Sequence, residues 1–189
     1  MTPQPDIQQL SAQYDSIERD ARALVDGVSE SAGTWRASAG SWSVAECLDH
    51  LAVANRVYLA AMREPAARAK TAGRNRSRPA LPGMVGGWFV RSLEPPVKPR
   101  RKLRAPGKIR PRKAPALADA FASFISSHHD VETFLREYAE IDLARIRFPN
   151  PFIRGVRFSL ATGLHVIGAH ERRHLWQARR VLERVPSGA

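Results

Sequence analysis

The sequence predicts an all-α protein, a four-helix bundle with a long crossover between its second and third helices. Three observations carry this prediction. Four long segments repeat apolar side chains at steps of three and four residues, as amphipathic helices do. We find no convincing strand pattern and no internal repeat. Eight of the 14 prolines fall in one stretch, about 71–115, which separates the second helix from the third. At 189 residues, the chain fits a single domain spanning 1–189.

The first helix is predicted over Ile7 to Val28. Its apolar side chains recur at helical steps and are Ile7, Leu10, Tyr14, Ile17, Ala21 and Leu24. The segment from Ser29 to Gly40 is small, polar and glycine-containing, so we expect a loop there.

The second helix has a marked beginning. Ser43 is a favoured N-cap and Glu46 stands three residues later, which is the capping-box pattern. The helix is predicted from Val44 to about Arg63, or to Lys70 if Pro65 only kinks it.

The crossover, about 71–115, is predicted to be extended or mobile, with a short helical piece at 85–93. The third helix follows over 116–138. A second connection, 142–157, is broken by two prolines. The fourth helix is predicted to begin after an N-cap at Ser159 and to end near Glu183.

The net charge of +12 is mostly local. Nine of the sixteen residues from Lys98 to Lys113 are Lys or Arg, so the rest of the chain carries about +3 (12 minus 9). No apolar run approaches the ~20 residues of a membrane span, and the N-terminus has no secretion signal. The single cysteine, Cys47, excludes an intrachain disulfide. We therefore expect no membrane partner and a cytoplasmic location.

Two of the six histidines share one face of the fourth helix. His170 and His174 are four residues apart, so they lie one turn apart in the row that continues through Ile167 and Gln177. That row is apolar at both ends. Buried imidazoles need partners, and one shared metal ion would satisfy a ring nitrogen of each.

His50 lies beside the apolar stripe of the second helix and is predicted to tilt inward. With His170 and His174 it would make a three-histidine site for one divalent metal ion, with a coordination position left open. The competing interpretation is that an inward histidine is simply hydrogen-bonded in the core.

The remaining histidines are assigned other roles. We expect His165 to be structural or to support a ligand, and His128 to be a hydrogen-bonded core residue. The run His170–His174 matches the H-E-x-x-H pattern of zinc proteases, but no third ligand follows at a suitable spacing, so we reject a protease. Glu171, about 100° from His170 around the helix, is predicted to face solvent or pair with Arg.

Two motifs resemble one known family. Residues 42–51 are similar to the W-S-x-x-E-x-x-x-H-L helix start of DinB-like (YfiT-type) proteins. Residues 170–177 are similar to their closing H-x-x-x-H-x-x-Q pattern. The resemblance covers roughly 8–184, in the right order and in the right elements.

The resemblance implies a four-helix bundle in which His50, His170 and His174 bind zinc, nickel or another divalent ion. It also implies a homodimer. Some related proteins are transferases or isomerases that use low-molecular-weight thiols such as bacillithiol or mycothiol. Gln177 and Glu46 recur in the family pattern as candidates for supporting the ligands, although the capping box already explains Glu46.

Two classes of function remain open at this point. One is a metal-dependent enzyme, a thiol transferase or a hydrolase, acting on a small-molecule thiol and an electrophile. The other is a non-catalytic metal-binding protein whose basic segment, 98–113, binds nucleic acid or another acidic partner. That segment has no aromatic residue for base stacking, so we favour a solvated loop over nucleic-acid binding.

Overall fold

The structure is a computed structural model that describes residues 4–96 and 106–186. Residues 98–105, the first half of the basic segment 98–113, therefore lie outside the described residues. The helices are α1 (Pro5–Val25), α2 (Glu30–Thr34), α3 (Val44–Thr71), α4 (Met84–Leu93), a 3-10 turn η1 (Gly107–Ile109), α5 (Leu117–Glu137) and α6 (Leu160–Leu182). The strands are β1 (Arg147–Pro149) and β2 (Arg157–Ser159).

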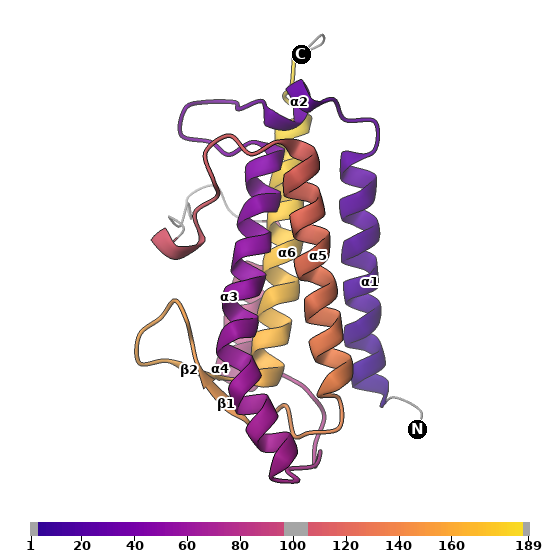
Figure 1. The fold of residues 1–189 in the computed structure, drawn as a ribbon, viewed down its shortest axis with the longest axis vertical. Coiled ribbons are helices and arrows are strands. Elements are labelled where there is room, and N and C mark those ends of the chain that lie inside the picture. The colour runs from indigo at the N-terminus through magenta and orange to yellow at the C-terminus, as the bar shows by residue number, and fades with distance from the viewer. Residues whose placement is uncertain (1–3, 97–105, 187–189) are drawn as a thin grey trace.

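Four long helices, α1, α3, α5 and α6, run side by side along the molecule (Figure 1). Both α1 and α3 pack against α5 and α6, and α4 covers a further side of α6. The predicted all-α class is confirmed, since the described residues are mostly helical and contain one short strand pair. As a result, α6 has helices against it on several sides, and more than one of its faces is buried.

The predicted loop after the first helix was wrong in part, because it contains the one-turn helix α2. The Ser29 hydroxyl accepts a hydrogen bond from the N–H of Ala32 and so caps this turn. Gly33 lies so close to Leu117 that a Cβ would stand 2.5 Å from its side chain. Glu30 in turn accepts a hydrogen bond from the Leu117 N–H, so α2 caps the beginning of α5.

The capping box of α3 is confirmed. Ser43 accepts from the Glu46 N–H, and the Glu46 carboxylate accepts from the Ser43 N–H. The helix continues past Pro65 to Thr71, which bears out the longer of the two predicted ends. The N-cap of α6 is also confirmed, with Ser159 accepting from the N–H of Thr162.

The described parts of the crossover are attached to the helices. Arg76 forms an ion pair with Asp6 at the beginning of α1, and the Ala80 N–H donates to the same carboxylate. The Ala80 carbonyl bonds to Nε2 of His165 on α6, at 3.1 Å. The predicted short helix is confirmed as α4. The crossover residues that make these contacts are not helical, which agrees with the predicted extended remainder.

The sequence analysis predicted no strands, and this is wrong for the second connection. β1 and β2 form an antiparallel pair in which Phe148 lies opposite Phe158. Both phenylalanines are buried. Strands of three residues are too short to show a period-2 pattern, so the sequence carried no signal for them.

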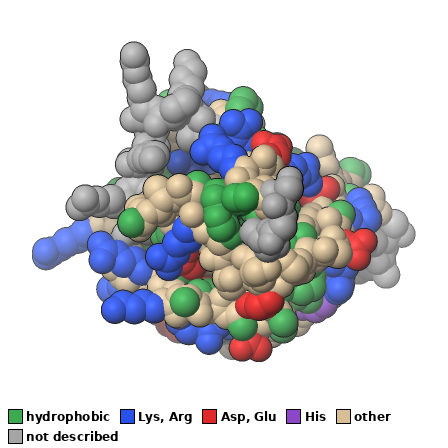
Figure 2. Space-filling view, turned by 90° about the horizontal axis from the view of Figure 1, so that it is seen from above, with side chains coloured by type: hydrophobic (Ala, Val, Ile, Leu, Met, Phe, Trp, Pro, Cys, Tyr) green, Lys and Arg blue, Asp and Glu red, His purple; other side chains and the backbone are tan. Residues whose placement is uncertain are grey.

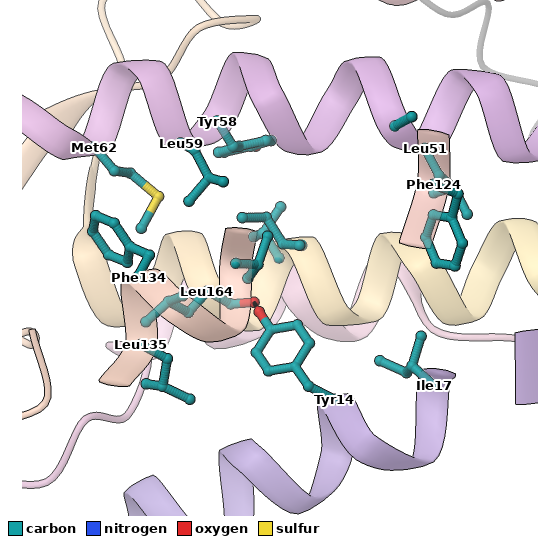
Figure 3. Close-up of a cluster of buried hydrophobic side chains, with 14 of the residues drawn as sticks. Tyr14, Ile17, Leu51, Tyr58, Leu59, Met62, Phe124, Phe134, Leu135 and Leu164 are labelled. Carbon is teal, nitrogen blue, oxygen red and sulfur yellow. Dashed lines mark hydrogen bonds between the residues drawn. The ribbon is translucent and has the colours of Figure 1, made fainter. Parts of the chain in front are cut away.

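The core lies between the four long helices (Figure 3). Tyr14 is fully buried, and its hydroxyl donates a 2.7 Å hydrogen bond to the carbonyl of Leu164. This bond satisfies the polar tip of the ring inside an apolar cluster and ties α1 to α6. Figure 3 shows Ile17 beside it, with Leu51 and Phe124 opposite.

Among the described residues, none of the helices has the length and apolar content needed to cross a bilayer. Figure 2 views the molecule from the end where α2 lies. Lys and Arg side chains gather most densely on the left of that view, and acidic side chains are scattered among the rest.

Candidate metal centre

Three imidazoles from two helices converge on one point. His50 comes from α3, and His170 and His174 come from α6. One ring nitrogen of each lies within 4.8 Å of the other two, and Nε2 of His50 is 3.2 Å from Nε2 of His170. The ring centroids form a nearly regular triangle with sides of 4.6, 4.6 and 5.0 Å.

Local sequence explains how each ring reaches this point. The capping box fixes the first turn of α3, and His50 follows in its second turn. The four-residue spacing places His170 and His174 on the face of α6 that packs against α3. His50 and His174 are buried, and His170 is partly buried.

A backbone carbonyl fixes the tautomer of His50. The carbonyl oxygen of Ile109, in η1, lies 2.5 Å from Nδ1 of His50. A carbonyl can only accept, so Nδ1 must carry the proton and donate it. Nε2 then keeps its lone pair, and it is the atom that faces His170. Metal-binding histidines are commonly held in this way.

The cluster is kept neutral. Burial lowers the pKa of His50, and burial together with the neighbouring imidazole of His50 lowers the pKa of His170 to about 3. Burial, and then the charges of His170 and His50, hold the pKa of His174 well below its usual range. Three neutral imidazoles are the protonation state that a metal ion requires.

The residues present fit a cation. Nδ1 of His174 is buried without a hydrogen-bond partner, and Nε2 of His50 has the neighbouring Nε2 of His170, at 3.2 Å, as its hydrogen-bond contact. Unsatisfied buried nitrogens are costly, and a bound cation accepting several lone pairs would remove that cost. The donor set, three imidazoles, is one that zinc and nickel accept.

Hydrogen bonds hold the end of the crossover against α3, next to this cluster. Asp49, the residue before His50, is buried and accepts hydrogen bonds of 2.8 Å from the backbone N–H and from Nε of Arg112. Two consecutive residues of α3 thus hold the segment from Ile109 to Arg112. Sequence reasoning missed this attachment, because a backbone acceptor such as Ile109 has no side-chain signature.

Trp42 forms a wall of the cluster. Its ring centroid lies 4.7 Å from that of His50 and 5.7 Å from that of His174. Gln177 follows His174 by three residues on α6, and its side chain opposes the lowering of the His174 pKa. Glu46 is engaged elsewhere, with the Ser43 N–H and in an ion pair with Arg36.

The prediction that Glu171 faces solvent or pairs with Arg was wrong. Its side chain is fully buried, and Oε1 bonds to Nδ2 of Asn55 at 2.8 Å and to Nδ1 of His128 at 3.1 Å. The prediction assumed one buried face on α6, whereas α6 is packed on several sides. Because Glu171 bonds to Asn55 and His128, it is not placed as the base of a protease.

The predicted core role of His128 is confirmed by its full burial and its bond to Glu171. His165 is structural, bonding to the Ala80 carbonyl. Cys47 is fully buried, and burial raises the pKa of its thiol far above the usual range, so it behaves as a small apolar residue.

A family model described as the DinB superfamily matches residues 13–178, most of the chain. The matched region contains all three histidines of the cluster. Neither the curated proteins nor the solved structures include a significant match to this sequence.

Proposed function

Because the chain belongs to the DinB superfamily, we propose that it binds one divalent metal ion through His50, His170 and His174, inside a four-helix bundle. The observation that carries the proposal is the convergence of three imidazoles, with ligand nitrogens within 4.8 Å of one another. Zinc or nickel is the proposed ion, because both accept imidazole ligands.

Three protein ligands leave a coordination position for a further group, as in catalytic rather than structural sites. When bound, the ion would supply Lewis acidity, which favours the anionic form of a thiol or of water. Among the described residues, Cys47 is no candidate nucleophile for this cluster, because its thiol is buried and burial raises its pKa. We therefore propose a transferase that uses a low-molecular-weight thiol such as bacillithiol or mycothiol, or a hydrolase.

The chain's own residues would orient and shield the reacting groups. The Ile109 carbonyl holds the His50 ring in one orientation, and Trp42 covers one side of the cluster. Exposed cations of the fastened segment, Lys108 and Arg110, stand close in sequence to Ile109 and would attract an acidic thiol.

The alternative is a non-catalytic metal-binding protein whose basic segment binds nucleic acid or another acidic partner. One observation favours it: Lys108, Arg110 and Lys113 are exposed around a segment that is itself fastened to α3. Such binding would weaken steeply with salt.

Metal analysis of the purified protein tests the site. We expect the three-histidine site to contribute about one equivalent of zinc or nickel to the wild-type chain, and we expect His170→Ala and His174→Ala each to lose that equivalent. His165→Ala is the matched control, because His165 is a histidine of the same helix whose ring bonds to the Ala80 carbonyl instead. Full metal content in both His170→Ala and His174→Ala would overturn the proposal.

A second pair of assays separates the two functions. The metal-loaded protein is incubated with thiols and an electrophile such as chlorodinitrobenzene, and thioether formation is followed. Metal-dependent turnover that His174→Ala abolishes supports the enzyme. Retention on DNA that falls with salt, without turnover, supports the alternative.

A further inference from the structure

A second cluster of metal-binding side chains lies between α1 and α5. It consists of Glu18 from α1 and of His128 and Glu132 from α5, whose ligand atoms all lie within 4.8 Å of one another. His128 is fully buried, and its Nε2 has no hydrogen-bond partner. An orphaned buried nitrogen next to two carboxylates calls for a ligand.

The other ring nitrogen of His128 is held as in known metal sites. Nδ1 of His128 lies 3.1 Å from Oε1 of the fully buried Glu171. The carboxylate accepts a hydrogen bond from the Nδ1–H, which leaves the lone pair of Nε2 facing the cluster. A carboxylate behind the imidazole fixes the ring and raises its basicity as a ligand.

From this geometry we propose a second divalent-cation site, formed by Nε2 of His128 and the carboxylates of Glu132 and Glu18. Nε2 of His128 is 3.9 Å from Oε1 of Glu132, which is too long for a hydrogen bond. Ligand bonds of ~2.1 Å place two donors of one ion on the order of 3–4 Å apart. One imidazole with two carboxylates suits Zn²⁺, Mn²⁺ or Co²⁺.

The charges around His128 also favour a cation. Glu171 is fully buried, and its second carboxylate oxygen, Oε2, has no hydrogen-bond partner. A positive charge on His128 offsets this carboxylate, whether it comes from a proton or from a metal ion on Nε2. A proton and a metal ion would compete for this one nitrogen.

The site has access to solvent. Glu18 and Glu132 are one-fifth and one-eighth exposed, with side-chain values of 20% and 12%. Oε2 of Glu18 also lies 3.2 Å from Nε2 of the half-exposed His129. His129 lines a surface groove over α5, together with Arg22 of α1 and Phe121 and Ile125 of α5. The groove borders the cluster through His129, although none of the three proposed ligands lines it.

The two proposed sites share no ligand, so each can be tested without the other. A Co²⁺ titration, followed by visible absorption and by metal analysis, counts the equivalents bound. We expect two in the wild-type chain and one in the double variant His170→Ala/His174→Ala. Adding Glu132→Gln or Glu18→Gln to that double variant should weaken the remaining equivalent at least tenfold, since even supporting residues cost about 10–100-fold.

The control on the same helix is Glu137→Gln, because Glu137 is half-exposed and contacts only Lys70 among the described ion pairs. It should leave the remaining equivalent unchanged. Circular dichroism checks that each variant folds, and the partly exposed Glu18 keeps the test valid should Glu132→Gln unfold.

Two results would overturn the second site. One is a double variant that binds no Co²⁺. The other is an equivalent in the double variant that neither glutamate substitution weakens. Failure of the three-histidine site is a different result: the double variant then binds as much metal as the wild-type chain.

Discussion

Nδ1 of His50 donates a hydrogen bond to the carbonyl oxygen of Ile109, 59 residues further along the chain, at 2.5 Å. One bond thus joins a histidine of the proposed metal centre to the crossover. The neighbouring pair, Asp49 with Arg112, fastens the same segment a few residues later. The orientation of His50 therefore depends on how the crossover is held.

Arg112→Ala is expected to weaken metal binding at the three-histidine site by a few-fold, at most about tenfold. The substitution removes the guanidinium contacts to Asp49 but keeps the backbone N–H bond, so Ile109 is held less firmly. Affinity measured by competition with a chromophoric chelator checks it. The control is Arg110→Ala, an exposed cation two residues away. Equal losses in both variants would point to general electrostatics instead.

Asn55→Ala should lower the free energy of unfolding by about 1–3 kcal/mol. Asn55 is buried and donates a 2.8 Å hydrogen bond to the buried Glu171 carboxylate, and the shorter side chain leaves that charge with one donor fewer. Urea denaturation measures the change. The exposed neighbour Arg56 gives the control, Arg56→Ala, for which we expect less than about 0.5 kcal/mol. Similar stability of the two variants would show that Asn55 does not support Glu171.

Asp6→Asn should destabilise the protein near neutral pH by about 1–2 kcal/mol. Burial raises the pKa of Asp6, but hydrogen bonds from Arg76 and from the Ala80 N–H outweigh it and lower the pKa below its usual range. A lowered folded-state pKa gives stability that is present above the unfolded pKa of ~3.9 and is lost as the pH falls through the folded value. The difference in stability between Asp6→Asn and the wild-type protein should therefore shrink as the pH falls.

Thermal melts from pH 7 down to pH 3 measure that difference. The control is Asp20→Asn on the exposed side of α1, which should follow the wild-type curve. A difference for Asp6→Asn that stays constant with pH would contradict the ion pair as its source.

Gly163→Ala should destabilise the protein by about 1–2 kcal/mol, because overpacking outweighs the gain in helix propensity. A Cβ at this position would stand 2.9 Å from Sδ of Met62 and 2.9 Å from the ring of Phe148. The matched control on the same helix is Gly168→Ala, whose Cβ would meet its nearest atom at 3.4 Å. Gly168→Ala should leave the free energy of unfolding unchanged or raise it slightly. A larger loss of stability in Gly168→Ala than in Gly163→Ala would contradict the overpacking at Gly163.

Local patterns account for what could be predicted. The bounds of α3, α5 and α6 and the caps at Ser43 and Ser159 depend on residues within a turn or two of each other. The inward direction of His50, His170 and His174 follows in the same way from helical spacing. Periodicity and capping act over three or four residues, so the sequence displays them directly.

Other features could not be predicted because they depend on distant contacts. Glu171 was assigned to the surface from its angle on one helix, yet α6 has neighbours on several sides and buries that angle too. The strand pair around Phe148 and Phe158 is only three residues long on each side. Helix α2 is stabilised largely by its fit against Leu117, far along the chain.

The sequence by itself determined the all-helical class, the main helix boundaries and the three histidines that face one another. The tertiary structure alone decided that Ile109 sets the tautomer of His50, that Asp49 fastens the crossover, and that Glu171 supports His128. The physical reason is the range of the interactions. Helical spacing and capping are local, whereas burial and hydrogen bonds between helices exist only once the chain has packed.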